Sequence, residues 1–270
     1  VPTIWLGLLA EMRKHGRKPE GFQYMLVGGS AVPRSMIAEF EIDFDVRVVH
    51  GWGMTETSPV GSTTTFSPAM RSLPIEKQVD LKVSQGRRMY TVDMRIVNDN
   101  GELLPNDGEA FGELQVRGHA VMNGYFEDEE ASEAALTDDG WLRTGDVAKI
   151  DPDGFMSLVD RTKDVIKSGG EWISSIDLEN AAQGHEAVKE CAVIAASHPK
   201  WAERPLLIIV LEAGKEVTGD EIKQYLADKV AKWWLPDDVV FVDEIPHTAT
   251  GKISKLTLRK LFADHVLSTV

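Results

Sequence analysis

The sequence predicts a multidomain protein of mixed α/β and α+β class. Its first 80 residues alternate strand-like and helix-like segments, whereas residues 85–160 hold short strand-like segments separated by Gly, Asp, Asn and Pro. A third pattern of strands and helices follows residue 163. Alternating strands and helices are typical of a parallel sheet, and short strands with turn residues are typical of antiparallel sheets or barrels. We therefore expect a parallel βαβ part, a β-barrel-like part and a small α+β domain.

Composition limits the classes of protein to which the chain can belong. It has 270 residues, enough for two domains, and 43% of them are hydrophobic, enough for a buried core. The 43 acidic residues exceed the 29 basic ones, which gives a formal net charge of −14. This excess argues against a nonspecific nucleic-acid binder, because such a protein needs a basic face that displaces counterions from phosphates.

Cys191 is the single cysteine of the sequence. An internal disulfide and a zinc site built from several cysteines are therefore excluded. The residue lies in the apolar run VKECAVIAA, and we interpret it as a buried core thiol rather than a reactive one. The sequence shows no signal-peptide pattern and no apolar run of membrane-spanning length. We expect a cytoplasmic protein without integral membrane contact, and leave peripheral contact with a membrane open.

The first predicted helix covers residues 3–15. Its apolar residues recur at helical spacing and are expected on one buried face: Ile4, Leu8, Leu9 and Met12. The chain enters this pattern without an initiator Met, so we expect it to be a piece of a longer protein.

A parallel βαβ unit is predicted next. Residues 22–29 form a strand that ends in glycines, residues 32–41 a helix with Pro33 in its first turn, and residues 45–53 a second strand. A strand, a helix and a strand at this spacing are typical of parallel pairing. Two strands do not make a stable doubly wound sheet, so the other strands are expected upstream.

The second part is predicted to be antiparallel or barrel-like. Strands are expected over residues 91–97, 112–118 and 155–160, with turns at DNG and DPDG. One helix, residues 128–136, interrupts them.

The third part alternates helices and strands. Helices are expected over residues 174–184, 218–234 and 254–266, and strands over residues 187–196, 204–213 and 238–246. Thr218 and Glu221 have the spacing of a capping box, which favours a helix start there.

The motif GWGMTETS begins at Gly51. Gly51 and Gly53 would let the backbone approach a flat ligand, and Trp52 offers an aromatic face. Thr55 supplies a hydroxyl group, and Glu56 a carboxylate that suits a Mg²⁺ ion among phosphate oxygens. The alternative is a polar strand-to-loop turn around a core tryptophan.

Three further motifs are weak when each is taken alone. LVGGSAVP, residues 26–33, precedes a helix whose N-terminus suits a negative group, but it lacks the spacings of nucleotide loops. GWLRTGDVAKID contains Asp146, whose carboxylate suits two ribose hydroxyls or else caps its own turn. PHTATGKISK puts Lys252 after a flexible turn, which suits a mobile cation that meets developing negative charge or else a solvated surface lysine.

The segment DRTKDVIKSGGEWISS, residues 160–175, joins the second and third parts. It combines several charges with a glycine pair, which is poor material for a core strand or a regular helix. It is either a solvated interdomain linker or a functional junction.

The order of these motifs is more specific than any one of them. Gly-Gly-Ser, Gly-x-Gly-x-Thr-Glu, Thr-Gly-Asp, Arg-x-Lys-Asp followed by Lys-Ser-Gly-Gly-Glu, and Thr-Gly-Lys occur in one series. In this series the whole chain resembles the adenylate-forming superfamily of acyl-CoA synthetases, luciferases and peptide-synthetase adenylation domains. VIKSGGEWISSIDLEN and VPRSMIAEFE are most similar to medium- and long-chain fatty acyl-CoA ligases.

The resemblance implies a domain plan. Residues 1–160 would be the C-terminal part of the large AMP-binding (adenylation) domain, with an α/β part over 1–80 and a β-barrel-like part over 85–160. Residues 161–167 would be a hinge, and residues 168–270 a small mobile C-terminal domain that rotates between two half-reactions. The Ser/Thr/Gly-rich phosphate loop of the family, TSGTTGxPK, does not occur in the sequence. We therefore expect a C-terminal fragment that is inactive by itself.

The resemblance also implies an activity. Family members use ATP and Mg²⁺ to convert a carboxylic acid to an acyl-AMP with release of pyrophosphate, and then transfer the acyl group to coenzyme A. The partners would be a carboxylic acid, ATP and CoA, with no nucleic acid, and a homodimer of the full-length protein stays open. An aromatic acid or an amino acid as substrate, and a non-catalytic adenylate-binding relative, are the alternatives.

Roles for individual residues follow from the same resemblance. In the first two parts they are Gly29, His50, Gly51 and Trp52 around the adenine, Thr55 at the phosphate, Glu56 at the Mg²⁺ and Asp146 at the ribose hydroxyls. In the third part they are Arg161 beside the ribose, Lys163 at the hinge, Lys167, Gly169 and Trp172 toward nucleotide and CoA, and Lys252 as the lysine that stabilises the adenylation transition state. The family pattern differs at Asp160, where many relatives have Gly, and at His247, where they have Arg or Lys.

Overall fold

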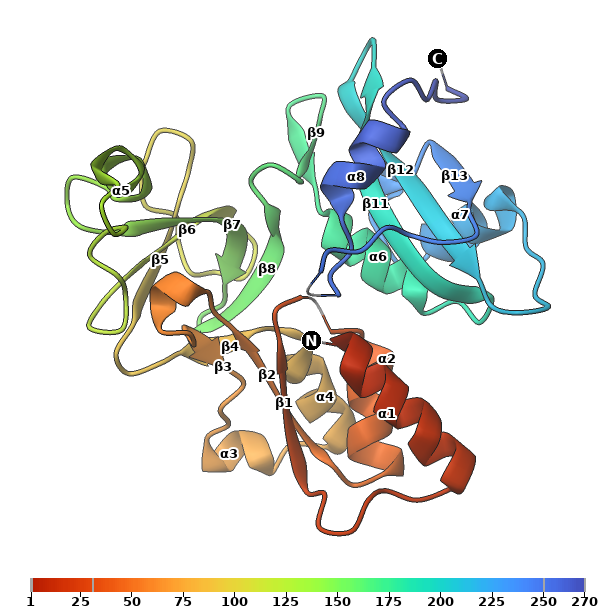
Figure 1. Ribbon diagram of the computed structural model, residues 1–270, viewed down its shortest axis with the longest axis horizontal. Coiled ribbons are helices and arrows are strands. Elements are labelled where there is room, and N and C mark those ends of the chain that lie inside the picture. The colour runs from red at the N-terminus through yellow and green to blue at the C-terminus, as the bar shows by residue number, and fades with distance from the viewer. Residues whose placement is uncertain (1, 31, 250, 270) are drawn as a thin grey trace. The chain divides into compact units, whose positions relative to one another are not determined.

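The computed structural model describes residues 2–30, 32–249 and 251–269. The chain divides into two compact units, Val1–Leu158 and Val159–Val270 (Figure 1). Each unit has its own sheet and its own buried core. Within the described ranges, no helix is both long and apolar enough to cross a membrane.

An eight-stranded sheet organises the first unit. Its strands hydrogen bond in the order β1-β2-β3-β4-β8-β7-β6-β5. They are β1 (Tyr24–Gly28), β2 (Arg47–Trp52), β3 (Ser62–Thr63), β4 (Gly86–Arg88), β5 (Asp93–Val97), β6 (Phe111–Arg117), β7 (Leu142–Ile150) and β8 (Phe155–Arg161). β1 and β2 pair in parallel, as predicted, and the later pairs such as β3–β4 and β5–β6 are antiparallel. The α/β part and the barrel-like part therefore share one hydrogen-bonded sheet.

Helices cover β1 and β2. They are α1 (Pro2–His15), α2 (Arg34–Ala38), which continues into a π-helical turn (Glu39–Asp43), and α4 (Ile75–Val83). Each contributes to one core with the two strands, through residues such as Leu9, Ile37 and Val79. Figure 1 shows these helices beside β1 and β2, and α5 (Glu129–Ala135) near β5 to β7. A short α3 (Pro68–Arg71) and α4 were not predicted.

The buried face of α1 is rotated from the predicted one. Leu9 and Met12 are buried, as predicted, but Ile4 is 69% exposed. Trp5 lies about 100° further around the helix and packs against the core in its place. The prediction for Ile4 was wrong because the large indole ring, and not the isoleucine, fills the space over the sheet.

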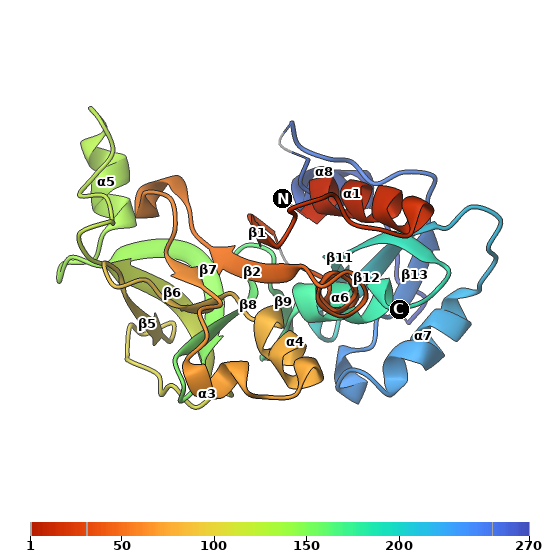
Figure 2. The same ribbon diagram turned by 90° about the horizontal axis from the view of Figure 1, so that it is seen from below.

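A five-stranded sheet with helices on both faces forms the second unit. Its strands are β9 (Ile166–Ser168), β10 (Glu171–Ile173), β11 (Val188–His198), β12 (Ala202–Leu211) and β13 (Asp238–Phe241). Its helices are α6 (Ser175–Gln183), α7 (Gly219–Ala227) and α8 (Lys255–Leu261). One core joins α6 and α7 to one face of the sheet, and another joins α8 to the opposite face. Figure 2 shows α7 and α8 on opposite sides of β11 to β13. Cys191 is buried, as predicted.

α7 is shorter than the predicted helix over 218–234. The capping box is confirmed: the Thr218 hydroxyl accepts the N–H of Glu221 at 3.3 Å, and the Glu221 carboxylate accepts the N–H of Thr218 at 2.8 Å. After Ala227 the chain turns and forms only a 3₁₀ turn, Lys232–Trp234. The longer prediction was wrong: beyond Ala227, the carbonyls of Trp233 and Leu235 accept hydrogen bonds from a side chain of the sheet.

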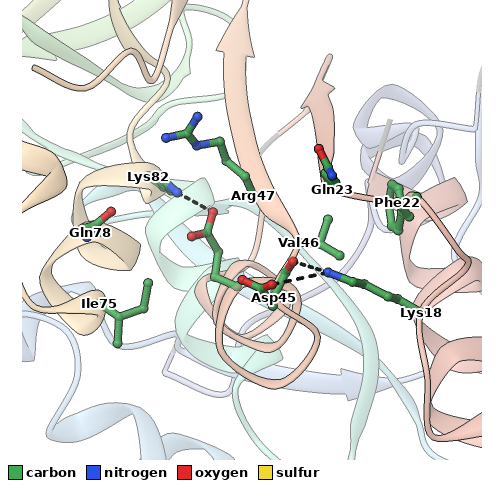
Figure 3. Close-up of a pocket in the computed structure, with 11 residues that line it drawn as sticks. Lys18, Phe22, Gln23, Asp45, Val46, Arg47, Ile75, Gln78 and Lys82 are labelled. Atoms are coloured by element: carbon green, nitrogen blue, oxygen red, sulfur yellow. Dashed lines mark hydrogen bonds and ion pairs between the residues drawn. The ribbon is translucent and has the colours of Figure 1, made fainter. Parts of the chain in front are cut away.

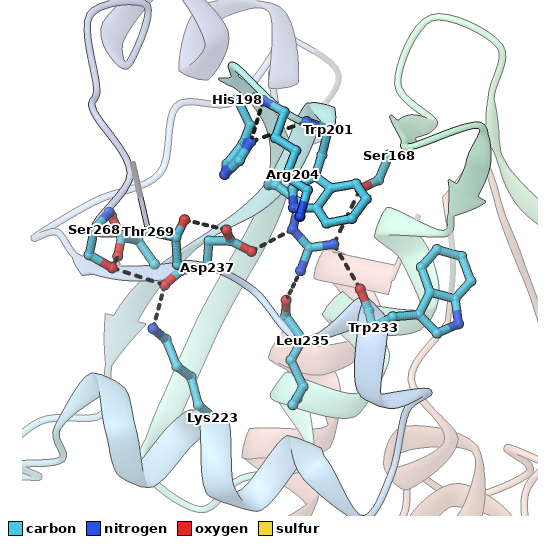
Figure 4. A network of polar contacts seen from close by, with 12 residues as sticks. Ser168, His198, Trp201, Arg204, Lys223, Trp233, Leu235, Asp237, Ser268 and Thr269 are labelled. Carbon is cyan, nitrogen blue, oxygen red and sulfur yellow. Dashed lines mark hydrogen bonds and ion pairs between the residues drawn. The ribbon is translucent and has the colours of Figure 1, made fainter.

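That side chain is Arg204, on β12. Its guanidinium donates to the Asp237 carboxylate at 2.6 Å, to the carbonyls of Trp233 and Leu235 at 2.8 and 3.0 Å, and to the Ser168 hydroxyl at 3.2 Å (Figure 4). A planar guanidinium with five fixed donors suits such a network. It joins β9, β12 and the segment before β13 in one arrangement.

Candidate functional site

A hydrogen bond joins Trp52 and Asp146 in the first unit. The indole Nε1 of Trp52 donates to Asp146 Oδ2 at 2.8 Å. Trp52 ends β2, and both residues are buried, at 7% and 6% exposure. Asp146 lies inside β7 and not in a turn, so the alternative that it caps its own turn was wrong. A buried carboxylate that accepts from a fixed indole is held in one orientation.

The ring of Trp52 belongs to the core of the sheet. It clusters with residues such as Val92 and Leu114. A Cβ added at Gly61 would lie only 2.4 Å from the ring, so Gly61 makes room for it. Trp52 is therefore a core residue, which was the alternative stated for it from the sequence. At the same time its Nε1 donates a hydrogen bond to Asp146.

His50 is fully buried, two residues before Trp52. Its Nδ1 lies 3.0 Å from the carbonyl oxygen of Lys82, which only accepts, so Nδ1 carries the proton. Its Nε2 is then an acceptor, and it has no hydrogen-bond partner among the described residues. Burial lowers the pKa of His50, so the ring is neutral at pH 7. Buried polar atoms without a partner are rare, and this one is suited to an N–H of a bound ligand.

The glycines of this region make room for the chain itself. A Cβ at Gly53 would lie 1.9 Å from the Pro59 carbonyl oxygen, and one at Gly51 would lie 2.9 Å from that of Ser62. Both positions therefore require glycine for the packing of the chain itself, whether or not a ligand also approaches them. Gly29, at the end of β1, has a φ of +86°, in the left-handed region that favours glycine.

Thr55 and Glu56 follow in a 3₁₀ turn, Thr55–Thr57. The buried Thr57 fixes this turn, because its hydroxyl accepts the N–H of Met54 at 3.0 Å. Thr55 is left exposed and Glu56 partly exposed. The Glu56 carboxylate accepts a hydrogen bond of 3.0 Å from the hydroxyl of Tyr125, which raises the pKa of Tyr125. Sequence reasoning missed this tyrosine, since 69 residues separate the two.

In the second unit, the β9–β10 hairpin collects three predicted residues. Lys167 and Trp172 are paired across the hairpin, and the ammonium lies 5.1 Å from the ring centroid. Gly169, at the turn, has a φ of +62° and donates its N–H to the carbonyl of Trp201 at 2.8 Å. Trp201 was not predicted, although a Cβ at Gly169 would lie only 2.9 Å from its ring.

Lys252 lies in a tight turn before α8. Its N–H donates to the Thr248 hydroxyl at 3.2 Å, and its carbonyl accepts the N–H of Thr248 at 2.7 Å. Thr250 of the same motif lies outside the described residues. The Lys252 side chain is exposed and has no polar partner in the part of the chain that the structure describes, including the β9–β10 hairpin. Arg161 and Lys163 are also exposed.

A polar cluster of Asp160, Ser175, Glu179 and Lys255 includes the first residue of α8, the helix that follows this turn in the chain. Asp160 accepts from the N–H of Ser175 at 2.9 Å, and Lys255 pairs with Glu179 at 2.8 Å and with the Ser175 hydroxyl. Burial raises the pKa of Glu179. For Lys255, burial lowers the pKa but the carboxylates of Glu179 and Asp160 outweigh it, so the net shift is upward. Asp160, where the family pattern often has Gly, thus fixes α6 to the segment before the predicted hinge.

The first unit also holds a cavity of about 560 Å³ (Figure 3). It contains none of the predicted site residues. Two of its cations are paired with its carboxylates: Lys82 with Glu41, and Lys18 with Asp45. The Lys82–Glu41 pair is buried, and the backbone carbonyl of Lys82 accepts a hydrogen bond from the His50 Nδ1. Lys82, a residue of the cavity wall, therefore also fixes the His50 ring through its backbone carbonyl.

Two family models match the chain. The AMP-binding enzyme model matches residues 1–126, and the model of the AMP-binding enzyme C-terminal domain matches residues 177–252. The chain belongs to the AMP-binding enzyme family. The first match contains the His50–Trp52 and Thr55–Glu56 segments, and the second ends at Lys252.

Two curated proteins are similar to nearly the whole chain. The 3-methylmercaptopropionyl-CoA ligase of Ruegeria lacuscaerulensis is 49% identical over 264 residues, which cover 98% of this chain and 48% of the relative. The medium-chain-fatty-acid–CoA ligase of Ectopseudomonas oleovorans is 48% identical over 267 residues, which cover 99% and 48%. The chain thus spans about half the length of the curated relatives it matches.

A solved structure has the same fold. It is the o-succinylbenzoate CoA synthetase of Bacillus subtilis in complex with its acyl-adenylate intermediate, with a TM-score of 0.79 and 32% identity. The match covers 96% of this chain and 49% of that one. The mixed α/β class predicted from the sequence is thereby confirmed.

Proposed function

We propose that the chain is the C-terminal portion of an AMP-forming acyl-CoA ligase that acts on a fatty or related carboxylic acid. The full-length protein would form an acyl-AMP from the acid and ATP, release pyrophosphate, and transfer the acyl group to CoA with release of AMP. Support comes from the curated relatives, which are named as CoA ligases. The observation that carries the proposal is that β2 holds both the donor of the buried Trp52–Asp146 hydrogen bond and, two residues earlier, the His50 Nε2 that lacks a partner among the described residues.

This arrangement suits an adenosine. The exocyclic amino group of adenine is a donor, and the neutral His50 Nε2 is a buried acceptor without a donor among the described residues. A carboxylate has about four acceptor sites, so Asp146 is able to serve the indole and the ribose hydroxyls together. Gly29 and Gly51 lie at the carboxyl ends of the two parallel strands, where open α/β sheets bind ligands.

Glu56 is proposed to bind the Mg²⁺ that accompanies ATP, with Thr55 at the phosphate. Among the described residues, no cluster of three or more His, Cys, Asp or Glu is placed to hold a metal. A single carboxylate fits the chemistry of Mg²⁺, which keeps several waters and uses substrate phosphates as ligands. The ion would screen the negative phosphates from the attacking carboxylate.

The second unit is proposed to act in both half-reactions. Lys252 would place its ammonium against the negative charge that develops on the phosphate during adenylation, which suits an exposed lysine without a protein partner in the described chain. Arg161 would assist at the ribose, and Lys167, Gly169 and Trp172 would face nucleotide and CoA. Rotation about Lys163, within the hinge 161–167, would exchange the two roles of the domain over residues 168–270.

A first test is ATP–pyrophosphate exchange by the full-length protein against a panel of acids. The panel runs from acetate to long-chain fatty acids and includes benzoate, coumarate and amino acids. Exchange with fatty acids is expected, and exchange with only aromatic acids or only amino acids would replace the fatty-acid proposal by that alternative. The 270-residue chain alone is expected to show no exchange, because the TSGTTGxPK loop is not in its sequence.

Lys252→Ala separates an enzyme from a non-catalytic adenylate-binding relative. An enzyme should lose acyl-AMP formation by several orders of magnitude, about 10³-fold or more, because charge stabilisation in the transition state is lost. Its affinity for ATP should change little. If the unsubstituted protein folds and binds ATP but shows no exchange with any acid, the non-catalytic alternative is correct.

A further inference from the structure

Glu56 has one tyrosine as its side-chain partner. The hydroxyl of Tyr125 donates to Oε1 at 3.0 Å, and within the described residues no hydrogen bond reaches Oε2. Tyr125 is 41% exposed, so the ring is not simply filling a core. A neutral donor fixes the carboxylate without cancelling its charge, whereas a Lys or Arg in the same place would compete with a metal ion for it.

The backbone holds the tyrosine in this place. The N–H of Tyr125 donates to the Ser132 hydroxyl at 2.8 Å, and that hydroxyl donates to the carbonyl of Asp128, the N-cap residue of α5. The N–H of Met122 donates to the backbone carbonyl of Glu56 at 2.9 Å. The loop before α5 therefore supports the Thr55–Thr57 turn through both backbone and side chain.

We propose that Tyr125 is a positioning residue that orients the Glu56 carboxylate toward the Mg²⁺ of bound Mg·ATP. The inference rests on the proposed function, in which Glu56 contacts that ion. Outer hydrogen bonds of this kind fix the direction in which a ligating oxygen points, and their loss costs about 10- to 100-fold in metal affinity in known sites. With one oxygen held by the tyrosine, the other is left for the cation.

The test compares Tyr125→Phe with Tyr90→Phe in the full-length ligase. Tyr90 is in the same unit and is 99% exposed, and its side chain forms no hydrogen bond with the described residues, which makes it a matched control. Two quantities are measured: the Mg²⁺ concentration for half-maximal ATP–pyrophosphate exchange, and the calorimetric affinity for ATP at low and at high Mg²⁺. Tyr125→Phe is expected to raise the half-maximal Mg²⁺ concentration about tenfold and to weaken ATP binding only at low Mg²⁺. Tyr90→Phe should change neither.

A merely structural role gives a different result. It would lower the melting temperature or reduce exchange equally at all Mg²⁺ concentrations, and either outcome without a shifted Mg²⁺ requirement would overturn the inference. Glu56→Gln distinguishes the positioning role of Tyr125 from the metal role of Glu56. If Glu56→Gln shifts the Mg²⁺ requirement and Tyr125→Phe does not, the positioning role of Tyr125 is wrong but the metal role of Glu56 stands. If Glu56→Gln has no effect on the Mg²⁺ requirement, both roles are wrong. In the Glu56→Gln background, Tyr125→Phe should add less than a twofold change.

Discussion

Trp52 and Asp146 are 94 residues apart in sequence, yet the indole N–H of one is bonded to the carboxylate of the other at 2.8 Å. The two residues come from motifs that each left an alternative open in the sequence, the Gly-x-Gly-x-Thr-Glu segment and the Thr-Gly-Asp segment. The hydrogen bond brings the two motifs together and fixes the Asp146 side chain, which is proposed to bind the ribose hydroxyls.

Trp52→Phe keeps an aromatic ring but removes the donor to Asp146. We expect the free energy of unfolding to fall by about 2–3 kcal/mol, because the buried and charged Asp146 carboxylate loses a hydrogen bond. Urea unfolding measures this change in the free energy of unfolding. Trp233→Phe, at a tryptophan that is 43% exposed, is the control and should change stability by less than about 0.5 kcal/mol. Equal effects from the two substitutions would contradict a special role for the bond.

His50 predicts a dependence of stability on pH. Burial lowers its pKa in the folded state below the ordinary value of 6.5. The unfolded chain therefore binds a proton that the folded chain does not, so this contribution to stability is present above pH 6.5 and is lost as pH falls. His50→Gln should make the loss between pH 7 and pH 5 smaller, in urea unfolding at both pH values. His15→Gln, at an exposed histidine, should leave the loss unchanged.

The buried Lys82–Glu41 pair predicts that removing one partner lowers the free energy of unfolding more than replacing both. Their side chains are 4% and 8% exposed, and Glu41 also accepts the N–H of Val48 at 2.5 Å. Lys82→Met leaves a buried carboxylate without its cation, and we expect a loss of about 3–5 kcal/mol. The double variant Lys82→Met, Glu41→Gln keeps the acceptor for Val48 and should recover most of the loss. A double variant no more stable than the single one would show that the charge balance is not the cause.

Two glycines in different surroundings predict opposite effects of the same substitution. Gly53→Ala would place its Cβ 1.9 Å from the Pro59 carbonyl oxygen, so the loop after β2 must shift, and we expect both lower stability and weaker ATP binding. Gly7 lies in the middle of α1 with nothing within 4 Å of an added Cβ. Gly7→Ala should therefore stabilise the chain by about 0.5–1 kcal/mol, since alanine is the better helix former. Thermal melts of both variants check the pair, and a stabilising Gly53→Ala would contradict the close packing.

Local patterns in the sequence were enough for much of the fold. The parallel pairing of β1 and β2 and the Thr218–Glu221 capping box follow from residues close together in the chain. The contacts that build the site do not: Trp52 with Asp146 and Tyr125 with Glu56 depend on how the strands of the sheet come together. The family resemblance named three of those four residues without any contact between them, and missed the tyrosine.

Two errors concern helices. Ile4 matches the helical spacing of α1, but the neighbouring Trp5 occupies the core. The helix expected to continue to residue 234 ends at Ala227, and beyond it the carbonyls of Trp233 and Leu235 accept hydrogen bonds from Arg204 of β12. Helical spacing indicates which residues share a face, but not which of two neighbouring large side chains packs in the core or where the helix ends.

The Arg204 network gives the β9–β10 hairpin a partner far along the chain. Its guanidinium bonds at once to Ser168 in the hairpin and to the segment 233–237. Amide hydrogens in these two stretches should therefore exchange with solvent as one cooperative group, with protection lost at the same denaturant concentration. Segments that open together also close together. The hairpin surface proposed to contact CoA would therefore be either fully folded or fully open, with no partly folded form.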